Sequence, residues 1–189
     1  MASSSRKQKE LSFLESVDSV LVGRGFHRPR GSQEWSVHDG KDRLWAHLNF
    51  GLSAVQLTVG VEYVDVRKAS HDLPGAVFSS SESPQRDWST DDAPERVADY
   101  VSEVVEARLP LLSDRCAVVA RLLEREVRSW PVFSFSHRIR LLPVLLVNLG
   151  RGEEALKFCR YIRGQSLSLD QIRPPFTEFC QTLESKLAD

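Results

Sequence analysis

The chain has 189 residues, with 25 Lys and Arg against 26 Asp and Glu, and a formal net charge of −1. This length suits one domain, or one compact domain with a helical extension. Hydrophobic residues make up 41% of the chain and charged residues 27%, a composition too apolar for a disordered protein. The balanced charge excludes a general attraction to nucleic acid or to an anionic membrane, so such binding would need a local patch.

The sequence predicts neither a membrane span nor a signal peptide. The longest apolar run, 141–149, is about half of the roughly 20 residues that cross a bilayer, and Pro143 interrupts it. After the basic N-terminus, Glu10 and Glu15 interrupt the apolar positions, so the h-region of a signal peptide is missing.

Three cysteines are present, Cys116, Cys159 and Cys180. Their odd number and wide spacing fit neither a disulfide framework nor a paired zinc motif. All three stand beside apolar residues in predicted helices, and we expect them to be small buried hydrophobes. Free thiols indicate a reducing compartment, most simply a cytoplasm.

The N-terminal region predicts a helix. Residues 1–9 are polar, and we expect a frayed terminus there. From Leu11 to Leu21, apolar residues recur at helical spacing with charged residues between them. Gly23 and Gly25 end this helix, because glycine readily takes the left-handed conformation that caps a helix.

Three apolar runs then predict a small antiparallel sheet. Residues 35–37 and 44–50 flank Asp39 and Gly40, a dipeptide typical of the two-residue turn of a β-hairpin. The long run 54–66 alternates apolar and polar residues, the pattern of a strand with one wet face. We expect a meander of three or four strands.

Residues 70–93 are rich in Gly, Pro, Ser and Asp and predict a long loop. A loop of this length in a compact domain is usually functional or disordered. Asp92 and Glu95, with Pro94 in the first turn, form a capping box that begins the next helix.

The rest of the chain predicts four further helices. The helix that contains Pro143 is expected to be kinked there or to begin late. The fold class is therefore α+β: an N-terminal helix on a small antiparallel sheet, followed by a helical C-terminal half. The expected helices cover about 114–129, 137–149, 153–163 and 174 onward. The expected organisation begins with a frayed terminus over 1–9. An α+β domain over 10–112 follows and contains the long, acidic loop of residues 70–93. A helical extension over 113–189 packs on the same core.

Charge is unevenly distributed along the chain. Residues 70–106 hold two basic and nine acidic residues, a net charge of −7, whereas residues 107–165 hold 11 basic and five acidic residues, a net charge of +6. In one interpretation these segments neutralise each other within the fold. In another, the acidic segment binds a basic partner protein, with Trp88 as an aromatic anchor. The candidate partner-binding residues are Asp87, Trp88, Asp91, Asp92 and Glu95.

A third interpretation assigns the basic segment to nucleic acid. Arginine outnumbers lysine 19 to 6 in the chain, which favours planar, bidentate contacts. Against it, Glu124 and Glu126 lie among the arginines, and a surface that tracks phosphates normally lacks such acids. The candidate residues are Arg121, Arg125, Arg128, Arg138 and Arg140, with Arg115 beside them.

We find no known catalytic motif in the sequence. The chain has no Gly-x-Ser-x-Gly elbow, no dinucleotide-binding glycine motif and no phosphate-binding loop of the Walker type. A small metal-dependent hydrolase would use His38, His47 and Asp39 on the predicted hairpin, but the spacing supplies no third or fourth ligand. We therefore predict no cofactor, no metal and no enzymatic activity.

Several short motifs resemble an uncharacterised bacterial family of unknown function. They are Gly25-Phe26-His27-Arg28, then Trp35-Ser36-Val37 and Leu48-Asn49-Phe50-Gly51, with Trp88 and Leu109-Pro110-Leu111-Leu112 further on. The resemblance covers residues 11–112. It implies a single-domain cytoplasmic α+β protein, and since some members lie among toxin-immunity genes, it implies binding rather than catalysis. No functional residues are carried over from it.

The leading hypothesis is a non-enzymatic protein-binding module, either an immunity-type inhibitor or an accessory subunit of a larger bacterial assembly. Its partner would be another protein with a basic surface. The alternatives are nucleic-acid binding through the arginine-rich helices and, third, the small hydrolase.

Overall fold

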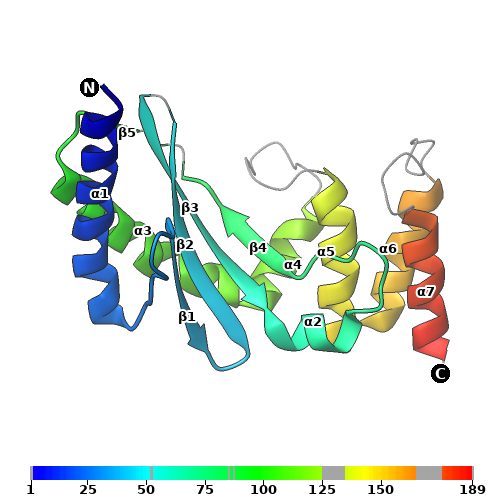
Figure 1. Ribbon diagram of the computed structural model, residues 1–189. Helices are drawn as coiled ribbons and strands as arrows, with labels where there is room; N and C mark the ends of the chain where they lie inside the picture. Colours follow the sequence, from blue (N-terminus) through cyan, green and yellow to red (C-terminus); the bar gives the residue numbers. More distant parts are fainter. Residues whose placement is uncertain are drawn as a thin grey trace. The chain divides into compact units, whose positions relative to one another are not determined.

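The computed structural model describes residues 2–51, 53–84, 86, 88–124, 135–164 and 176–188. It is an α+β protein with an N-terminal helix, a sheet and a helical C-terminal half, as predicted (Figure 1). The chain divides into two compact units, each with its own buried apolar residues. Unit 1 comprises Met1–Glu62 and Ser80–Ser113, and unit 2 comprises Tyr63–Ser79 and Asp114–Asp189.

Helix α1 spans Ala2–Leu21, so residues 2–9, for which we predicted a frayed terminus, belong to this helix. Arg6 holds these first turns, because its guanidinium donates to Glu10 one turn ahead and to the carbonyl of Gly51, each at 2.9 Å. The helix ends as predicted. After the 3₁₀ turn η1 (Val22–Arg24), Gly25 has a φ of 84°, and the N–H of Phe26 donates to Leu21 O.

The predicted hairpin is confirmed, with its turn one residue further along. Strands β1 (Glu34–Asp39) and β2 (Asp42–Phe50) pair antiparallel, and Asp39 lies opposite Asp42. The two turn residues are therefore Gly40 and Lys41. Only Gly40 has a positive φ, 58°, and a glycine at the first turn position is what a type II′ turn requires.

Strand β3 spans Ala54–Tyr63, and helix α2 (Val64–Ser70) follows at once, so the predicted strand over 54–66 is three residues too long. The β-branched Val64 and Val66 favour a strand, but both lie in the first turn of α2. Asp65, between them, accepts the N–H of Val66 and binds the Arg115 guanidinium at 2.7 and 2.9 Å, and a carboxylate in the first turn favours a helix.

The segment 70–93, predicted as a loop, contains two short strands, β4 (Ser79–Glu82) and β5 (Trp88–Ser89). The strand order is β1-β2-β3-β4, and β5 pairs antiparallel with the start of β3, where Trp88 lies opposite Val55. This pairing places Trp88 on the same face of the sheet as the buried alternate residues of β3.

Helices α1 and α3 (Pro94–Ser113) cover that face and pack against each other, which closes the core of unit 1. The apolar side of α3 is buried. The core residues include Phe13, Val17, Leu21, Trp35, Leu48, Val59, Val61, Val97, Val101 and Val105.

On the opposite face of the sheet, the indole of Trp45 lies directly on Gly60. A Cβ at position 60 would come within 2.4 Å of the Trp45 ring and 2.9 Å of the carbonyl of Ser80. Glycine in the interior of β3 is therefore explained by close approach of a side chain rather than by a turn.

Unit 2 is helical, and its most buried helix is α5 (Phe135–Asn148), which contacts α2, α4 and α6. Pro143 lies inside α5, so the helix begins well before the proline and not at it. The remaining helices are α4 (Arg115–Leu123), α6 (Gly152–Gly164) and α7 (Phe176–Ala188).

Local signals set the ends of these helices. Asp114 caps α4, because its carboxylate accepts the N–H of Ala117 at 3.1 Å. Gly150 has a φ of 74° and ends α5 in a Schellman motif, in which Arg151 N donates to Leu146 O at 2.8 Å. No described helix is long and apolar enough to cross a membrane. Cys159 and Cys180 are buried as expected, but Cys116 is exposed, and the expectation for it is wrong.

Candidate functional site

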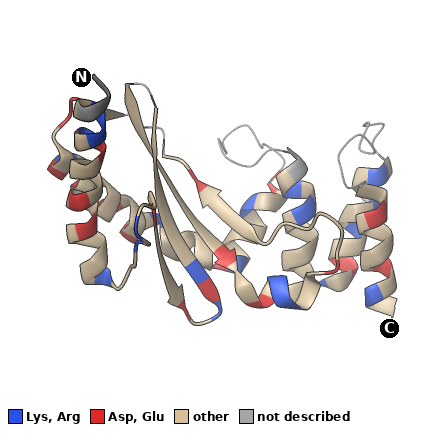
Figure 2. Ribbon diagram, viewed as in Figure 1, with Lys and Arg blue, Asp and Glu red and all other residues tan. Residues whose placement is uncertain are grey.

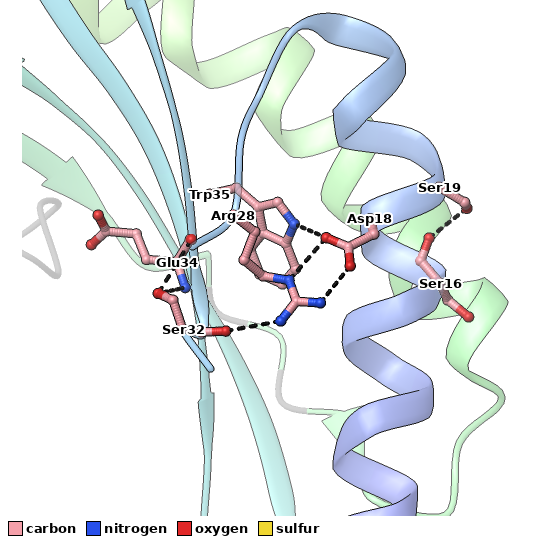
Figure 3. Close-up of polar contacts among 7 residues, drawn as sticks. All are labelled: Ser16, Asp18, Ser19, Arg28, Ser32, Glu34 and Trp35. Carbon is pink, nitrogen blue, oxygen red and sulfur yellow. Dashed lines mark hydrogen bonds and ion pairs between the residues drawn. The ribbon is translucent and has the colours of Figure 1, made fainter. Parts of the chain in front are cut away.

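The Asp18–Arg28–Trp35 cluster joins the Gly25-Phe26-His27-Arg28 motif to helix α1 (Figure 3). Arg28 binds both carboxylate oxygens of Asp18, and its Nε donates at 2.9 Å. The indole N–H of Trp35 donates to the same carboxylate at 2.7 Å, and the Arg28 guanidinium carbon lies 5.5 Å from the centre of the indole ring. This motif therefore holds α1 on the sheet.

The electrostatics of this cluster favour its charged state. The hydrogen bond from Arg28 is the largest influence that lowers the pKa of Asp18, burial partly opposes it, and the Trp35 N–H adds to it. In return, the hydrogen bond to Asp18 raises the pKa of Arg28. A carboxylate that is engaged from two sides is part of the scaffold of unit 1.

The acidic segment does not expose Trp88 as the partner-binding hypothesis requires. Asp87 lies outside the described residues. Trp88 is 5% exposed, its ring centre is 5.5 Å from that of Tyr100, and the Arg86 guanidinium carbon lies 4.1 Å from its ring centre. Trp88 is therefore a core residue of unit 1 and is not available as a surface anchor. Its buried indole N–H has no hydrogen-bond partner among the described residues.

Two other predicted partner-binding residues are engaged within unit 1. Asp91 accepts from the Lys9 ammonium at 2.6 Å, and that hydrogen bond lowers the pKa of Asp91. Asp92 accepts the backbone N–H of Ser89 at 2.8 Å and lies 3.9 Å from Arg96. Asp92 thus helps to hold the turn between β5 and α3, and Asp91 pairs with Lys9 of α1 at the surface.

Two further acids of the segment also have basic partners in unit 1. Glu82 lies 3.7 Å from Arg108, and Glu106 lies 3.1 Å from Arg24. Local neutralisation therefore occurs, and these basic partners come from unit 1 itself.

Three further acids of the segment lie on α3 with exposed side chains. Glu95, Asp99 and Glu103 follow one another at intervals of four on α3, so they form a stripe on one side of the helix, which we call the α3 stripe. Within the described residues, no salt bridge engages any of the three. Figure 2 shows acidic residues on the first turns of α3. The partner-binding hypothesis included Glu95 but neither Asp99 nor Glu103. In the sequence, the helical spacing places these two acids on the side of the helix opposite Val97 and Val101, which the structure buries.

The described arginines of the nucleic-acid hypothesis are largely engaged within unit 2. Arg140 is 4% exposed and donates to Pro74 O at 2.9 Å. Arg138 donates to Leu122 O at 2.6 Å and to Glu124 O at 3.2 Å, so it satisfies carbonyls at the end of α4. Arg121 is half-buried, and Arg125 and Arg128 lie outside the described residues. Arg115 is bound to Asp65.

The histidines of the hydrolase hypothesis are far apart. In the hairpin register, His38 lies opposite Arg43 and His47 lies opposite Glu34. These rungs are four apart, which separates the two imidazoles by about 13 Å along the strands. In the described part of the chain, no group of three or more His, Cys, Asp and Glu is placed to hold a metal ion.

A hollow of about 270 Å³ lies in unit 1 between the start of α1 and the end of β2. Phe13 and Phe50 supply its apolar surface, and their ring centres are 6.2 Å apart. The charged side chains around it, Arg6, Lys9 and Glu10, all take part in the ion pairs already described. Its walls therefore hold α1 in place.

Comparisons of the chain with protein-family models, with curated proteins and with solved structures gave no match.

Proposed function

We propose that this protein is a non-enzymatic binding module whose α3 stripe docks on a basic surface of another protein. The observation that supports the proposal is a contrast within one segment. Asp91, Asp92, Glu82 and Glu106 have basic partners in unit 1. The three acids of the α3 stripe are exposed, lie in a line and have no salt bridge within the described residues. Charges arranged in this way raise the rate and specificity of encounter with a complementary surface.

The helix that carries the α3 stripe is firmly supported. Val97, Val101 and Val105 bury its opposite side, and α3 packs along α1. A rigid helix holds its charged side chains in a fixed line, so little conformational entropy is lost when a partner binds them. We propose an immunity-type inhibitor or an accessory subunit of a bacterial assembly, acting in the cytoplasm and belonging to the uncharacterised family that the sequence resembles.

The test is to identify the partner and map where it docks. The tagged full-length protein, with a photo-crosslinking amino acid at Ser102 beside the α3 stripe, is purified from its native cells at moderate salt. Bound protein is identified by mass spectrometry, and nucleic acid is quantified. We expect one stoichiometric protein partner, and we expect the triple variant Glu95→Gln, Asp99→Asn, Glu103→Gln to bind it about tenfold more weakly.

The matched control removes three exposed acids elsewhere: Glu15→Gln, Asp39→Asn, Glu153→Gln. It changes the net charge by the same amount and is expected to leave the affinity unchanged. Equal affinity of both triple variants and the wild type would overturn docking on the α3 stripe. Recovery of nucleic acid alone, with a steep dependence on salt, would favour the arginine-rich helices instead.

A further inference from the structure

Two aromatic rings of unit 1 bind a guanidinium of the chain itself. The ring centres of Trp88 and Tyr100 lie 5.5 Å apart, and the two planes are tilted by 54°. The guanidinium carbon of Arg86 lies 4.1 Å from the centre of the Trp88 ring and 5.2 Å from that of Tyr100. The negative face of an aromatic ring attracts a cation at such distances. The two rings therefore form a guanidinium site, which Arg86 occupies.

The charges around this site also favour a cation. Burial is the main cause that raises the pKa of the Tyr100 phenol, and Arg86 and Arg108 oppose this rise. The carboxylates of Glu103 and Glu82 add to it, so both act on the site. Glu82 lies 3.7 Å from Arg108, whereas Glu103 belongs to the α3 stripe and has no salt bridge within the described residues. The guanidinium site thus lies beside the α3 stripe and shares its negative potential.

Arg86 is exposed, although it covers the buried ring of Trp88. In the part of the chain that the structure describes, no carboxylate pairs with Arg86. Arg96 differs, because its guanidinium carbon lies 5.6 Å from the Trp88 ring centre and it also pairs with Asp92. A cation–π contact of an exposed side chain is weak, so a second guanidinium can compete with Arg86 for the rings.

We propose that the rings of Trp88 and Tyr100 bind an arginine side chain of the partner protein, which takes the place of Arg86 when the partner docks. The identity of the partner rests on the proposed function, but the site can be tested without it. A basic surface that meets the α3 stripe reaches this side of α3, and guanidinium groups stack on aromatic rings better than ammonium groups do. Arg86 is then an internal competitor, which lowers the affinity for the partner.

The experiment measures binding of N-acetyl-arginine amide to the full-length protein with isotope-labelled tryptophan. The indole N–H of Trp88 gives its own NMR signal, which is assigned from Trp88→Phe or from the contact with Tyr100. In Arg86→Ala we expect the probe to shift this signal saturably. In the wild type, where Arg86 competes, we expect about fivefold weaker binding. N-acetyl-citrulline amide has nearly the same shape without the charge, and we expect no shift with it.

Arg30→Ala is the matched control, because Arg30 is also exposed in unit 1 and its loss changes the net charge equally. This variant is expected to bind the arginine probe as the wild type does. Three results would each overturn the inference: no shift in Arg86→Ala, an equal shift with the citrulline probe, or equal affinity of Arg86→Ala and the wild type.

A second measurement uses the purified partner. Arg86→Ala is expected to bind it about fivefold more tightly than the wild type does, whereas the triple variant of the α3 stripe binds it more weakly. If no protein partner is recovered, the proposed function fails, and the arginine probe still decides whether the rings bind a guanidinium. A partner that docks on the α3 stripe of a protein that does not bind the probe would overturn this inference alone.

Discussion

Each unit contains one bidentate arginine–aspartate pair with an aromatic ring beside the guanidinium. In unit 1, Arg28 binds Asp18 and lies 5.5 Å from the ring centre of Trp35. In unit 2, Arg115 binds Asp65 and lies 5.4 Å from the ring centre of Tyr63. The side-chain exposures also match, at 17% and 31% for the first pair and 15% and 30% for the second.

The two clusters differ in what else holds each partner. In unit 1 the aspartate has a second donor, because the Trp35 indole N–H binds Asp18. In unit 2 the second donor is the backbone N–H of Val66, which binds Asp65 in the first turn of α2. Each arginine also keeps another acceptor, Ser32 O for Arg28 at 3.1 Å and Asn148 Oδ1 for Arg115 at 2.8 Å. The difference is that loss of the aspartate leaves the indole N–H of the fully buried Trp35 without its acceptor in unit 1. The comparison predicts that unit 1 depends more on its carboxylate than unit 2 does.

The largest effect is expected for Asp18→Ala. It removes the carboxylate that Arg28 binds and the acceptor of the Trp35 indole N–H, and we expect the free energy of unfolding of unit 1 to fall by about 3 kcal/mol, as for the loss of two hydrogen bonds to a charged group. Urea unfolding, with hydrogen exchange of the α1 and β3 peptides, measures this loss. Asp18→Asn should cost less, because an amide oxygen still accepts one hydrogen bond. A loss below that of Asp65→Ala would contradict the comparison.

Asp65→Ala should have the second largest effect. Arg115 keeps Asn148 and the Tyr63 ring, so we expect unit 2 to lose about 2 kcal/mol. Exchange should increase in α2 and α4, where the pair is anchored, before it increases in α1. Equal destabilisation of both units by this substitution would show that the two clusters do not stabilise their units independently.

A smaller difference between the units is expected in their response to pH. Burial lowers the pKa of His137 below the ordinary value of 6.5, and its Nε2 lies 2.9 Å from Ser79 O. The unfolded state therefore binds a proton before the folded state does, so unit 2 loses stability as pH falls below about 6.5. In unit 1, Asp18 has a lowered pKa, so its contribution is complete above pH 3.8 and is lost only as pH falls further.

Hydrogen exchange of α5 and of β3 at pH 7 and pH 5, corrected for intrinsic rates, checks this difference. We expect α5 to lose protection between these values, and His137→Gln to remove most of that loss. A wild-type α5 whose protection is the same at both values would contradict the prediction.

The smallest effect is expected for Asp91→Ala. Its pair with Lys9 is exposed to water on both sides, so solvent already screens the two charges. We expect no measurable change in urea unfolding, in contrast to Asp18→Ala. A clear loss of stability would show that the turn between β5 and α3 depends on this surface contact.

Local chemistry made several elements predictable from the sequence. The end of α1 at Gly25, the hairpin at Gly40, the cap at Asp114 and the turn at Gly150 each depend on residues within a few positions of one another. A glycine with positive φ or a capping carboxylate acts within one turn, so its effect is visible in the chain itself.

Contacts between distant residues account for the errors. The end of β3 depends on Arg115, 50 positions after Asp65, and the burial of Trp88 depends on its pairing with Val55. Cys116 has apolar neighbours in the sequence, which predicted burial, but it lies on the exposed side of α4.

The sequence by itself determined the α+β class, the order of the elements and the surplus of acid around α3, because composition and periodicity carry that information. Only the tertiary structure decided which acids have basic partners, which tryptophan is buried and which cysteine is exposed. Those outcomes depend on which faces pack together, and a side chain becomes a scaffold contact or an exposed charge only when its distant neighbours are in place.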